Sequence, residues 1–305
     1  MALSINRILV GLDFSDADIP LLKYTSFLCS LVNPVRVYFV HIHRSLDIPE
    51  EIRKKIPQLR QPLDEHLEEQ MKETVENIFG DNISFKTEFI VHEGSPLKEI
   101  LRWAHIKNID LLLAGRKKTS QGSGILPQEL SRKISCPVLL VPVMARPVMK
   151  KIFLPLDFSS YSDIAFQYAL KLAEASHAEI CCYHVTSLPS GYYTTGKSEE
   201  EFFSILKEHA LSKYQKLLRK FRADQKTISI LIEPGKKSIA YMVNTRAHAE
   251  KADLILIGAR GHTNASALLL GSLTEKVIRD DYDIPVLVVK QKNKKLSFWE
   301  MIKEI

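Results

Sequence analysis

The residues best placed to bind a ligand lie in the last third of the sequence, where three glycines and two hydroxyl residues are spaced regularly. Two residues separate Gly258 from Gly261, and nine separate Gly261 from Gly271-Ser272, with Thr274 close behind. Glycine lets the backbone turn sharply and approach a ligand with no Cβ atom in the way. Gly271-Ser272 is expected to open a helix, where backbone N–H groups and the two hydroxyls can face a phosphate. The spacing matches neither a Walker A loop nor the GxGxxG of a dinucleotide fold.

Other residue types that carry chemistry form weaker patterns. His41 and His43 share one face of a strand, but no nearby cysteine or acid completes a metal site, so structural packing is favoured. No Gly-x-Ser-x-Gly follows a strand, which argues against a Ser-His-Asp hydrolase. The cysteines form no CxxC pair and fall in apolar stretches, as buried reduced thiols of a cytoplasmic protein do. No catalytic residue and no metal ligand is predicted.

The elements that position these residues occur twice. Four segments of the first half recur in the second at offsets of 143 to 148 residues: 12–15 as 156–159, 41–42 as 184–185, 110–115 as 253–258, and 137–141 as 285–289. A repeat kept in register over a whole half indicates a tandem duplication, joined near residues 144–150. We therefore expect domains at 1–146 and 147–291, followed by a C-terminal tail at 292–305.

Each half alternates short apolar strands with helices. The strands are expected near residues 7–12, 35–42, 83–91, 109–114 and 137–142, and near 151–156, 179–185, 228–232, 253–257 and 285–289. This alternation predicts two flavodoxin-like (Rossmann-like) α/β domains, each a five-stranded parallel sheet of order 3-2-1-4-5 with helices on both faces. Ligands of such sheets bind where strands 1 and 4 end, at Asp13 and Gly115 in the first half and Asp157 and Gly258 in the second.

The glycine spacing, with Asp157 on the neighbouring strand, resembles the ATP-binding branch of the universal stress protein family. The whole chain resembles a tandem universal stress protein, over residues 4–143 and 148–291. The resemblance implies that ATP, with or without Mg²⁺, is bound by eleven residues of the second half: Pro155, Leu156, Asp157, Val185, Gly258, Arg260, Gly261, Gly271, Ser272, Leu273 and Thr274.

The resemblance also implies a role for each part of that set. Asp157 would contact the nucleoside, and a backbone group at Val185 would contact adenine. Pro155 and Leu156 would lie against the base. The glycine loop would hold the ribose and phosphates. Arg260 stands where the family often has histidine, and it either reaches a phosphate or points to solvent.

The first half departs from this pattern after Gly115. Lys118 replaces the second glycine, and the distance from the strand-4 glycine to the proline of strand 5 is 22 residues instead of 27. The Gly-Ser-Gly sequence that follows could still form an anion nest. A degenerate first site therefore remains an alternative to a domain that binds no nucleotide, with the residues Asp13, Ile42, Gly115, Gly122, Ser123 and Gly124. The basic triplet at 116–118 is interpreted as a solvated loop.

Composition and charge narrow the class of protein. Of 305 residues, 45% are hydrophobic and 26% charged, which excludes a disordered or collagen-like chain. The apolar runs have the length of strands and are far too short to span a membrane. Half of the formal net charge of +6 lies in residues 290–305, so a basic nucleic-acid-binding domain is not expected. The N-terminus reads as a strand rather than a signal peptide, which favours the cytoplasm.

The C-terminal tail contains a capping box, Ser297 with Glu300, and its apolar residues at 298, 301, 302 and 305 share one helical face. Docking of this short helix on its own domain or on a dimer mate is favoured over a membrane-surface anchor. The fifth strands, near 138–141 and 286–289, are expected to pair within one chain as a pseudo-dimer, and two chains could form a homodimer.

These observations predict a cytoplasmic stress-response protein that binds ATP in its C-terminal domain and acts as a nucleotide-dependent binding or signalling module. One alternative is a slow ATPase or other nucleotide-processing enzyme. The motif loop offers only Arg260, His262 and hydroxyls near a γ-phosphate, which weakens that alternative because hydrolysis needs a base or acid that positions water. A second alternative is an interaction scaffold that binds no nucleotide.

Overall fold

The computed structural model describes residues 4–45, 62–80, 83–117, 125–224, 226–261, 270–280 and 283–290. The chain divides into two compact units, and the boundary between them falls between Val148 and Met149. The predicted tail helix at 292–305 lies outside the described residues, as do the expected Gly-Ser-Gly nest at 122–124, Lys118 and His262. No helix among the described residues is long and apolar enough to cross a membrane.

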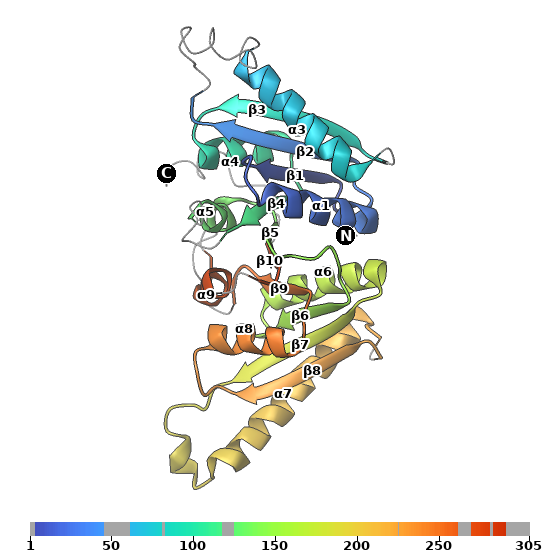
Figure 1. Ribbon diagram of the computed structural model, residues 1–305. Helices are drawn as coiled ribbons and strands as arrows, with labels where there is room; N and C mark the ends of the chain where they lie inside the picture. Colours follow the sequence, from blue (N-terminus) through green and yellow to red (C-terminus); the bar gives the residue numbers. More distant parts are fainter. Residues whose placement is uncertain are drawn as a thin grey trace. The chain divides into compact units, whose positions relative to one another are not determined.

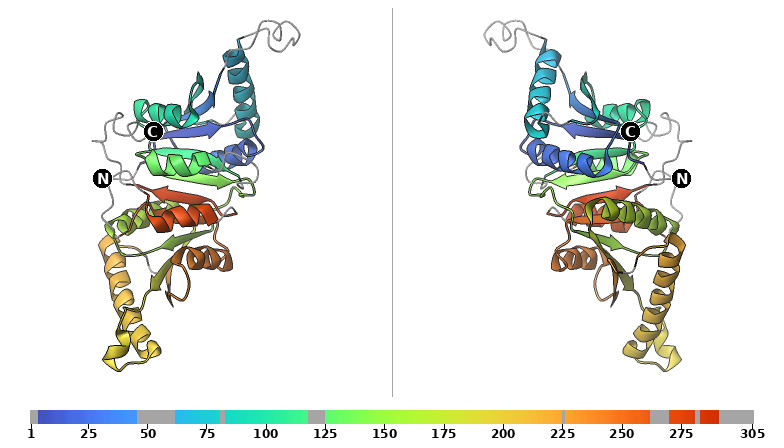
Figure 2. Two further views of the ribbon diagram at one scale, coloured as in Figure 1. Left: turned by 90° about the vertical axis from the view of Figure 1, so that its left-hand side faces the viewer. Right: turned by 90° about the vertical axis from the view of Figure 1, so that its right-hand side faces the viewer.

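The described part of the first unit folds around a parallel sheet of the predicted order. Its strands pair in the order β3-β2-β1-β4-β5. The strands are β1 (Arg7–Leu12), β2 (Arg36–His43), β3 (Lys86–Glu93), β4 (Leu111–Arg116) and β5 (Val138–Pro142). Helices cover both faces of the sheet, as Figures 1 and 2 show. They are α1 (Asp18–Val32) and α3 (Leu63–Phe79), which pack together, and α4 (Pro96–Ile106) and α5 (Ile125–Lys133).

The second unit repeats this order. Its described strands pair as β8-β7-β6-β9-β10, which is again 3-2-1-4-5 in chain order. They are β6 (Lys151–Pro155), β7 (Glu179–Thr186), β8 (Ile228–Pro234), β9 (Leu254–Gly258) and β10 (Val286–Val289). The helices are α6 (Ser160–Ser176), α7 (Glu199–Phe221), α8 (Ile239–Ala249) and α9 (Ser272–Asp280). A one-turn 3₁₀-helix, Tyr192–Thr195, was not predicted.

The repeated aspartate ahead of the fourth strand has a structural cause. The Oδ2 atom of Asp110 accepts the backbone N–H groups of Asn6 and Arg7, both at 3.0 Å. Asp253 does the same for Lys150 and Lys151, at 2.8 and 3.0 Å. Each carboxylate therefore ties the start of its unit's first strand to the start of the fourth, and this fixes the pair of strands whose ends bear the predicted sites.

The central strands are buried on both faces, as expected for a parallel sheet covered by helices. Every residue of β9 and of β10 is buried. All four cysteines are buried and carry free thiols: Cys29, Cys136, Cys181 and Cys182. Burial raises the pKa of the Cys29 thiol to about 12, so this cysteine stays protonated and unreactive at neutral pH.

Side-chain caps begin the helices of the second unit. The Ser159 hydroxyl accepts the N–H of Ser162, so Ser159 rather than Ser160 is the N-cap of α6. Helix α7 begins with a complete capping box, in which the Ser198 hydroxyl accepts the Glu201 N–H and the Glu201 carboxylate accepts the Ser198 N–H. Glu199, Glu200 and Glu201 lie at the positive end of this helix dipole.

Replacing Ser198 with alanine is expected to lower the free energy of unfolding by about 1 kcal/mol, because an N-cap hydroxyl bond is lost. Chemical denaturation followed by circular dichroism measures the change. The matched control is Ser212→Ala, at an exposed position within the same helix, where alanine is the better helix former and no loss is expected. Equal losses in the two variants would contradict a capping role.

Candidate nucleotide-binding site

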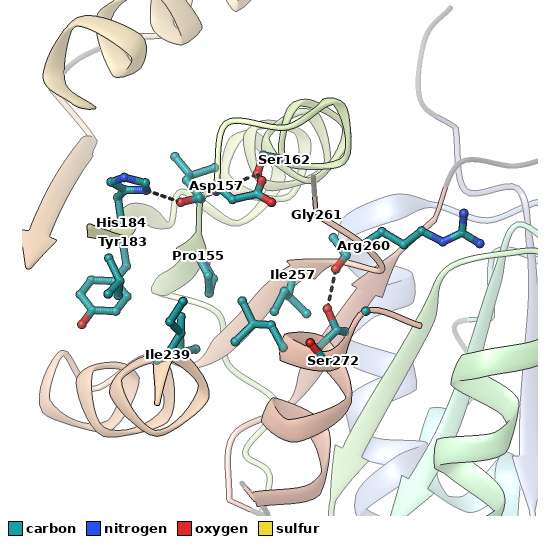
Figure 3. A pocket seen from close by; sticks show the side chains of 17 residues that line it. Pro155, Asp157, Ser162, Tyr183, His184, Ile239, Ile257, Arg260, Gly261 and Ser272 are labelled. Atoms are coloured by element: carbon teal, nitrogen blue, oxygen red, sulfur yellow. Dashed lines mark hydrogen bonds between the residues drawn. The ribbon is translucent and has the colours of Figure 1, made fainter. Parts of the chain in front are cut away.

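A cavity of about 210 Å³ lies in the second unit where β6, β7 and β9 end and where α8 and α9 begin. Its wall includes all eleven residues that the sequence pointed to, from Pro155 at the end of β6 to Thr274 in α9. Figure 3 shows these side chains around the opening between the strand ends and the helices. Six further residues complete the wall and were not anticipated: Ser162, Tyr183, His184, Ile239, Val243 and Ile257.

Asp157 is held in one orientation at the rim of this cavity. Its Oδ1 atom accepts the Ser162 hydroxyl at 2.5 Å and the Ser159 backbone N–H at 2.9 Å. The Asp157 N–H in turn donates to the Ser162 hydroxyl oxygen at 3.1 Å. Ser162 therefore acts as a clamp on both the backbone and the carboxylate of Asp157, and this places the carboxylate at the cavity rather than in solvent (Figure 3).

Gly261 has to be a glycine because of Asp157. A Cβ atom built at Gly261 would lie 2.3 Å from Asp157 Oδ2, far inside contact distance. The carboxylate cannot swing aside without giving up the hydrogen bonds of its other oxygen to Ser162 and Ser159. The second glycine of the motif thus allows the loop after β9 to close over Asp157.

The start of α9 is fixed against the end of β9. The Gly271 N–H donates to the Ala259 carbonyl at 2.8 Å, and the buried Thr274 hydroxyl donates to the Gly258 carbonyl at 2.8 Å. The proton of Thr274 is therefore used to position the helix. Ser272, the first residue of α9, is exposed at the helix N-terminus. Backbone N–H groups of this first turn have no partner within the helix and can receive an anion.

Arg260 borders the cavity, but its guanidinium lies over the Tyr161 ring, 5.7 Å from the ring centroid. Its Nη1 atom also donates to the Tyr161 hydroxyl at 3.3 Å. Figure 3 shows the side chain extending away from Pro155 and Ile257. The sequence left two orientations open for Arg260. In the structure its side chain points out of the cavity and its guanidinium lies over the Tyr161 ring.

His184 fixes the turn that carries Asp157. Its Nδ1 atom lies 2.7 Å from the Leu156 carbonyl oxygen, and because a carbonyl only accepts, Nδ1 bears the proton. Its ring contacts the Phe158 ring at 4.8 Å, and Phe158 holds a left-handed φ of 60° that is rare for a bulky residue. The first unit repeats this arrangement with His41, the Leu12 carbonyl at 3.0 Å and Phe14 at φ 55°. Structural packing was the function predicted for His41.

The affinity for an adenine nucleotide is expected to stay constant between pH 6.5 and 8. Burial lowers the pKa of His184 below its usual 6.5, so the neutral imidazole predominates over this range and the tether to Leu156 is kept. Isothermal titration calorimetry with Mg-ATP at several pH values measures this. A drop in affinity toward pH 6.5 that disappears in His184→Asn would show instead that His184 titrates there.

The first unit has a larger cavity, of about 580 Å³, in the corresponding place. Of the residues expected for a degenerate site, Asp13, Ile42 and Gly115 border it. The solvated-loop interpretation of the basic triplet is wrong for both of its described members. Arg116 is the buried last residue of β4, and Lys117 forms an ion pair with Asp13 at 3.1 Å with its side chain only 15% exposed.

The fold and the site together define a duplicated flavodoxin-like α/β protein with a cavity at the switch point of each unit's strand order. The sequence model of the universal stress protein family matches residues 4–142 and 149–290. The chain therefore belongs to the universal stress protein family, and the two matches confirm the predicted tandem arrangement.

Individual relatives resemble one half or the whole chain. Universal stress proteins MJ0577 and MJ0531 of Methanocaldococcus jannaschii are each 32% identical to it, over 47% and 48% of this chain and 96% and 84% of the relatives. A universal stress protein of Archaeoglobus fulgidus has a similar structure, with a TM-score of 0.65 and 18% identity over 96% of this chain and 99% of its own. At that identity the likeness concerns the fold.

Proposed function

We propose that the second unit binds ATP in the cavity at the ends of β6 and β9, and that the chain acts as a nucleotide-dependent binding or signalling module in a stress response. The observation that carries the proposal is the close approach of Gly261 to Asp157. The clamped Asp157 carboxylate under this loop offers an acceptor for a sugar hydroxyl. The N-terminus of α9 beside it offers N–H donors for phosphates.

The walls of the cavity suggest how the nucleotide lies. Pro155, Ile257 and Val243 provide an apolar slot for a flat base, next to the backbone at Val185. The ribose then lies near Asp157. The volume of about 210 Å³ is below the usual 300–1,000 Å³ of ligand pockets, so the phosphates extend beyond it along Gly271 and the first turn of α9. The clamping of Asp157 by Ser162 favours this position for the sugar.

Binding is favoured over hydrolysis by the groups that border the cavity. Among the described wall residues, Asp157 is the sole carboxylate, and its Oδ1 atom accepts hydrogen bonds from Ser162 and Ser159. The neutral His184 donates its Nδ1 proton to the Leu156 carbonyl. In the proposed pose these two groups border the base and the ribose rather than the phosphates along α9, so we propose at most a weak ATPase activity.

The test is to identify small molecules released from the purified native chain by mass spectrometry, and to measure the thermal shift with Mg-ATP. An adenine nucleotide at about one equivalent per chain is expected, and a smaller amount in Asp157→Ala, which binds it more weakly. Absence of adenine nucleotide together with no thermal shift would overturn the proposal. Turnover to ADP that persists in Gly261→Val would indicate a contaminating ATPase. Domain pairing, a homodimer and a cytoplasmic location remain predictions.

A further inference from the structure

The cavity of the first unit differs from that of the second in its charged groups more than in its fold. Both oxygens of Asp13 are engaged, Oδ1 by the Ser15 hydroxyl and Oδ2 by Lys117 Nζ at 3.1 Å. The positive charge of Lys117, the residue that follows β4, is therefore neutralised by Asp13 of the same unit. In the second unit the corresponding cation, Arg260, lies on the Tyr161 ring instead.

The residue that causes this difference lies at the start of the first helix. Ala17 occupies the place of Tyr161, since a Cβ at Gly115 would meet Ala17 Cβ at 3.1 Å and a Cβ at Gly258 would meet Tyr161 Cβ at 3.1 Å. Alanine has no ring to hold a cation. Lys117 therefore reaches across to Asp13 and pairs with it, with the lysine side chain covered and that of Asp13 exposed.

A second carboxylate of this unit, that of Asp18, binds backbone N–H groups of the same turn. Asp18 stands where Ser162 stands in the second unit, and its carboxylate accepts the N–H groups of Asp13 at 3.2 Å and Phe14 at 2.7 Å. It is only 8% exposed. Among the described residues, three carboxylates and two cations border the cavity, so this part of the lining is slightly acidic: Asp13, Asp18, Glu129, Arg44 and Lys117. Arg44 is exposed, where solvent screens its attraction for an anion.

The remaining wall is apolar and large. The volume of about 580 Å³ lies within the 300–1,000 Å³ of ligand pockets. The principal apolar residues come from three strands and two helices: Leu12, Ile42, Leu97, Ile100, Ala114 and Leu130. Leu126 lies 11 residues before Pro137, which directly precedes β5, and Thr274 lies 11 residues before Pro285, which directly precedes β10. An apolar side chain therefore replaces the hydroxyl at this place in the first unit.

We infer that the first unit binds an uncharged, largely apolar ligand, and does not bind a nucleoside triphosphate. Among the described charged groups of the wall, Lys117 is paired with Asp13 and Arg44 is exposed to solvent, so a phosphate gains little from these cations and meets the buried Asp18 carboxylate. An apolar ligand instead gains from the area it removes from water. The two units of the chain thus take ligands of different chemical class.

The test titrates the intact chain with Nile red, an uncharged fluorescent dye, in the presence of excess Mg-ATP. Saturable binding of one equivalent is expected. Leu97→Asp places a charge in the apolar wall and is expected to weaken dye binding at least about 10-fold, the effect of roughly 1.4 kcal/mol. Position 97 is in the first turn of α4, where aspartate suits the helix dipole, so the unit should stay folded.

The matched control is Ile239→Asp, in the first turn of α8 at the wall of the other cavity. It is expected to leave dye binding unchanged. Failure of the folded chain to bind the dye saturably would overturn the inference, as would equal losses in both variants. Two equivalents of ATP per chain, reduced to one by Leu97→Asp, would also overturn it. The contrast between Leu97→Asp and Ile239→Asp assigns the dye to one cavity whether or not the second unit binds ATP.

Discussion

Replacing Gly261 with alanine is expected to weaken Mg-ATP binding by about 10- to 100-fold, because the new methyl group would lie where the Asp157 carboxylate is. The 2.3 Å contact has to be relieved either by breaking the hydrogen bonds of Asp157 or by moving the loop. Overpacking of this kind costs about 1–3 kcal/mol, and each 1.4 kcal/mol is a factor of ten in affinity. Isothermal titration calorimetry gives the dissociation constants.

A double-mutant cycle separates the steric effect from a general disturbance of the loop. In the Asp157→Ala background, the methyl group of alanine 261 has no carboxylate to meet, so Gly261→Ala should cost little further affinity. The control is Gly271→Ala, where a Cβ would lie 3.3 Å from the Ala259 carbonyl oxygen and touch no group of Asp157. Additive effects of the changes at 261 and 157 would mean that the close approach plays no part in binding.

Replacing Asp18 with asparagine is expected to stabilise the first unit at neutral pH. Burial, with the nearby Asp13 charge as a smaller contribution, raises the pKa of Asp18 from 3.8 to about 6, although backbone N–H groups and Lys117 act in the opposite direction. A shift of this size corresponds to an ionisation penalty of about 3 kcal/mol when the pH exceeds both values. Asparagine retains an acceptor oxygen for the Phe14 N–H and carries no charge.

The sign of the pH dependence follows from the raised pKa. The folded chain holds the Asp18 proton more tightly than the unfolded chain, so this residue's contribution to stability is complete below pH 3.8. It declines as the pH rises and is lost above about 6. The gain in Asp18→Asn should therefore be absent at pH 4 and reach about 1–3 kcal/mol at pH 7.5.

Trp103 lies in α4 of the first unit, so its fluorescence reports the unfolding of that unit once the other tryptophan is removed by Trp299→Phe. Denaturant titrations at pH 4, 5, 6 and 7.5 give the stabilities. The control is Asp16→Asn, an exposed acid of the same turn. If Asp18→Asn shows the pH dependence of the parent chain, then Asp18 ionises in the folded unit as it does in the unfolded chain.

The fold could be predicted because the signals that determine it are local and occur twice. Alternating apolar strands and helices, repeated at a nearly constant offset, leave few arrangements of a parallel sheet, and both units have the predicted order. The ends of elements were predicted less well. The third strand was expected at 83–91 and runs from Lys86 to Glu93, since it is partly exposed and its apolar pattern fades gradually.

The candidate site could be predicted as far as it depends on strand ends and glycines. His184 and Tyr183 were missed as wall residues. The alternation of a strand shows which side chains share a face, but not that His184 bonds to the carbonyl of Leu156, 28 residues earlier. Ile239 and Val243 were missed because the spacing of one apolar helix face does not tell which cavity it borders. The surroundings of Lys117 depend on the side chain at position 17, a contact between elements about 100 residues apart.

The histidine tether described above has a consequence for design. His41 and His184 hold their turns by carbonyl bonds of 3.0 and 2.7 Å, and each turn passes through a phenylalanine with φ near 55–60°. The backbone between the tether and the first helix therefore follows a similar path in both units. Two side chains along it differ: the first unit has Ala17 where the second has Tyr161, and Asp18 where the second has Ser162. Exchanging residues 12–18 with 156–162 would therefore exchange the neighbours of Lys117 and Arg260 while each unit keeps its own sheet.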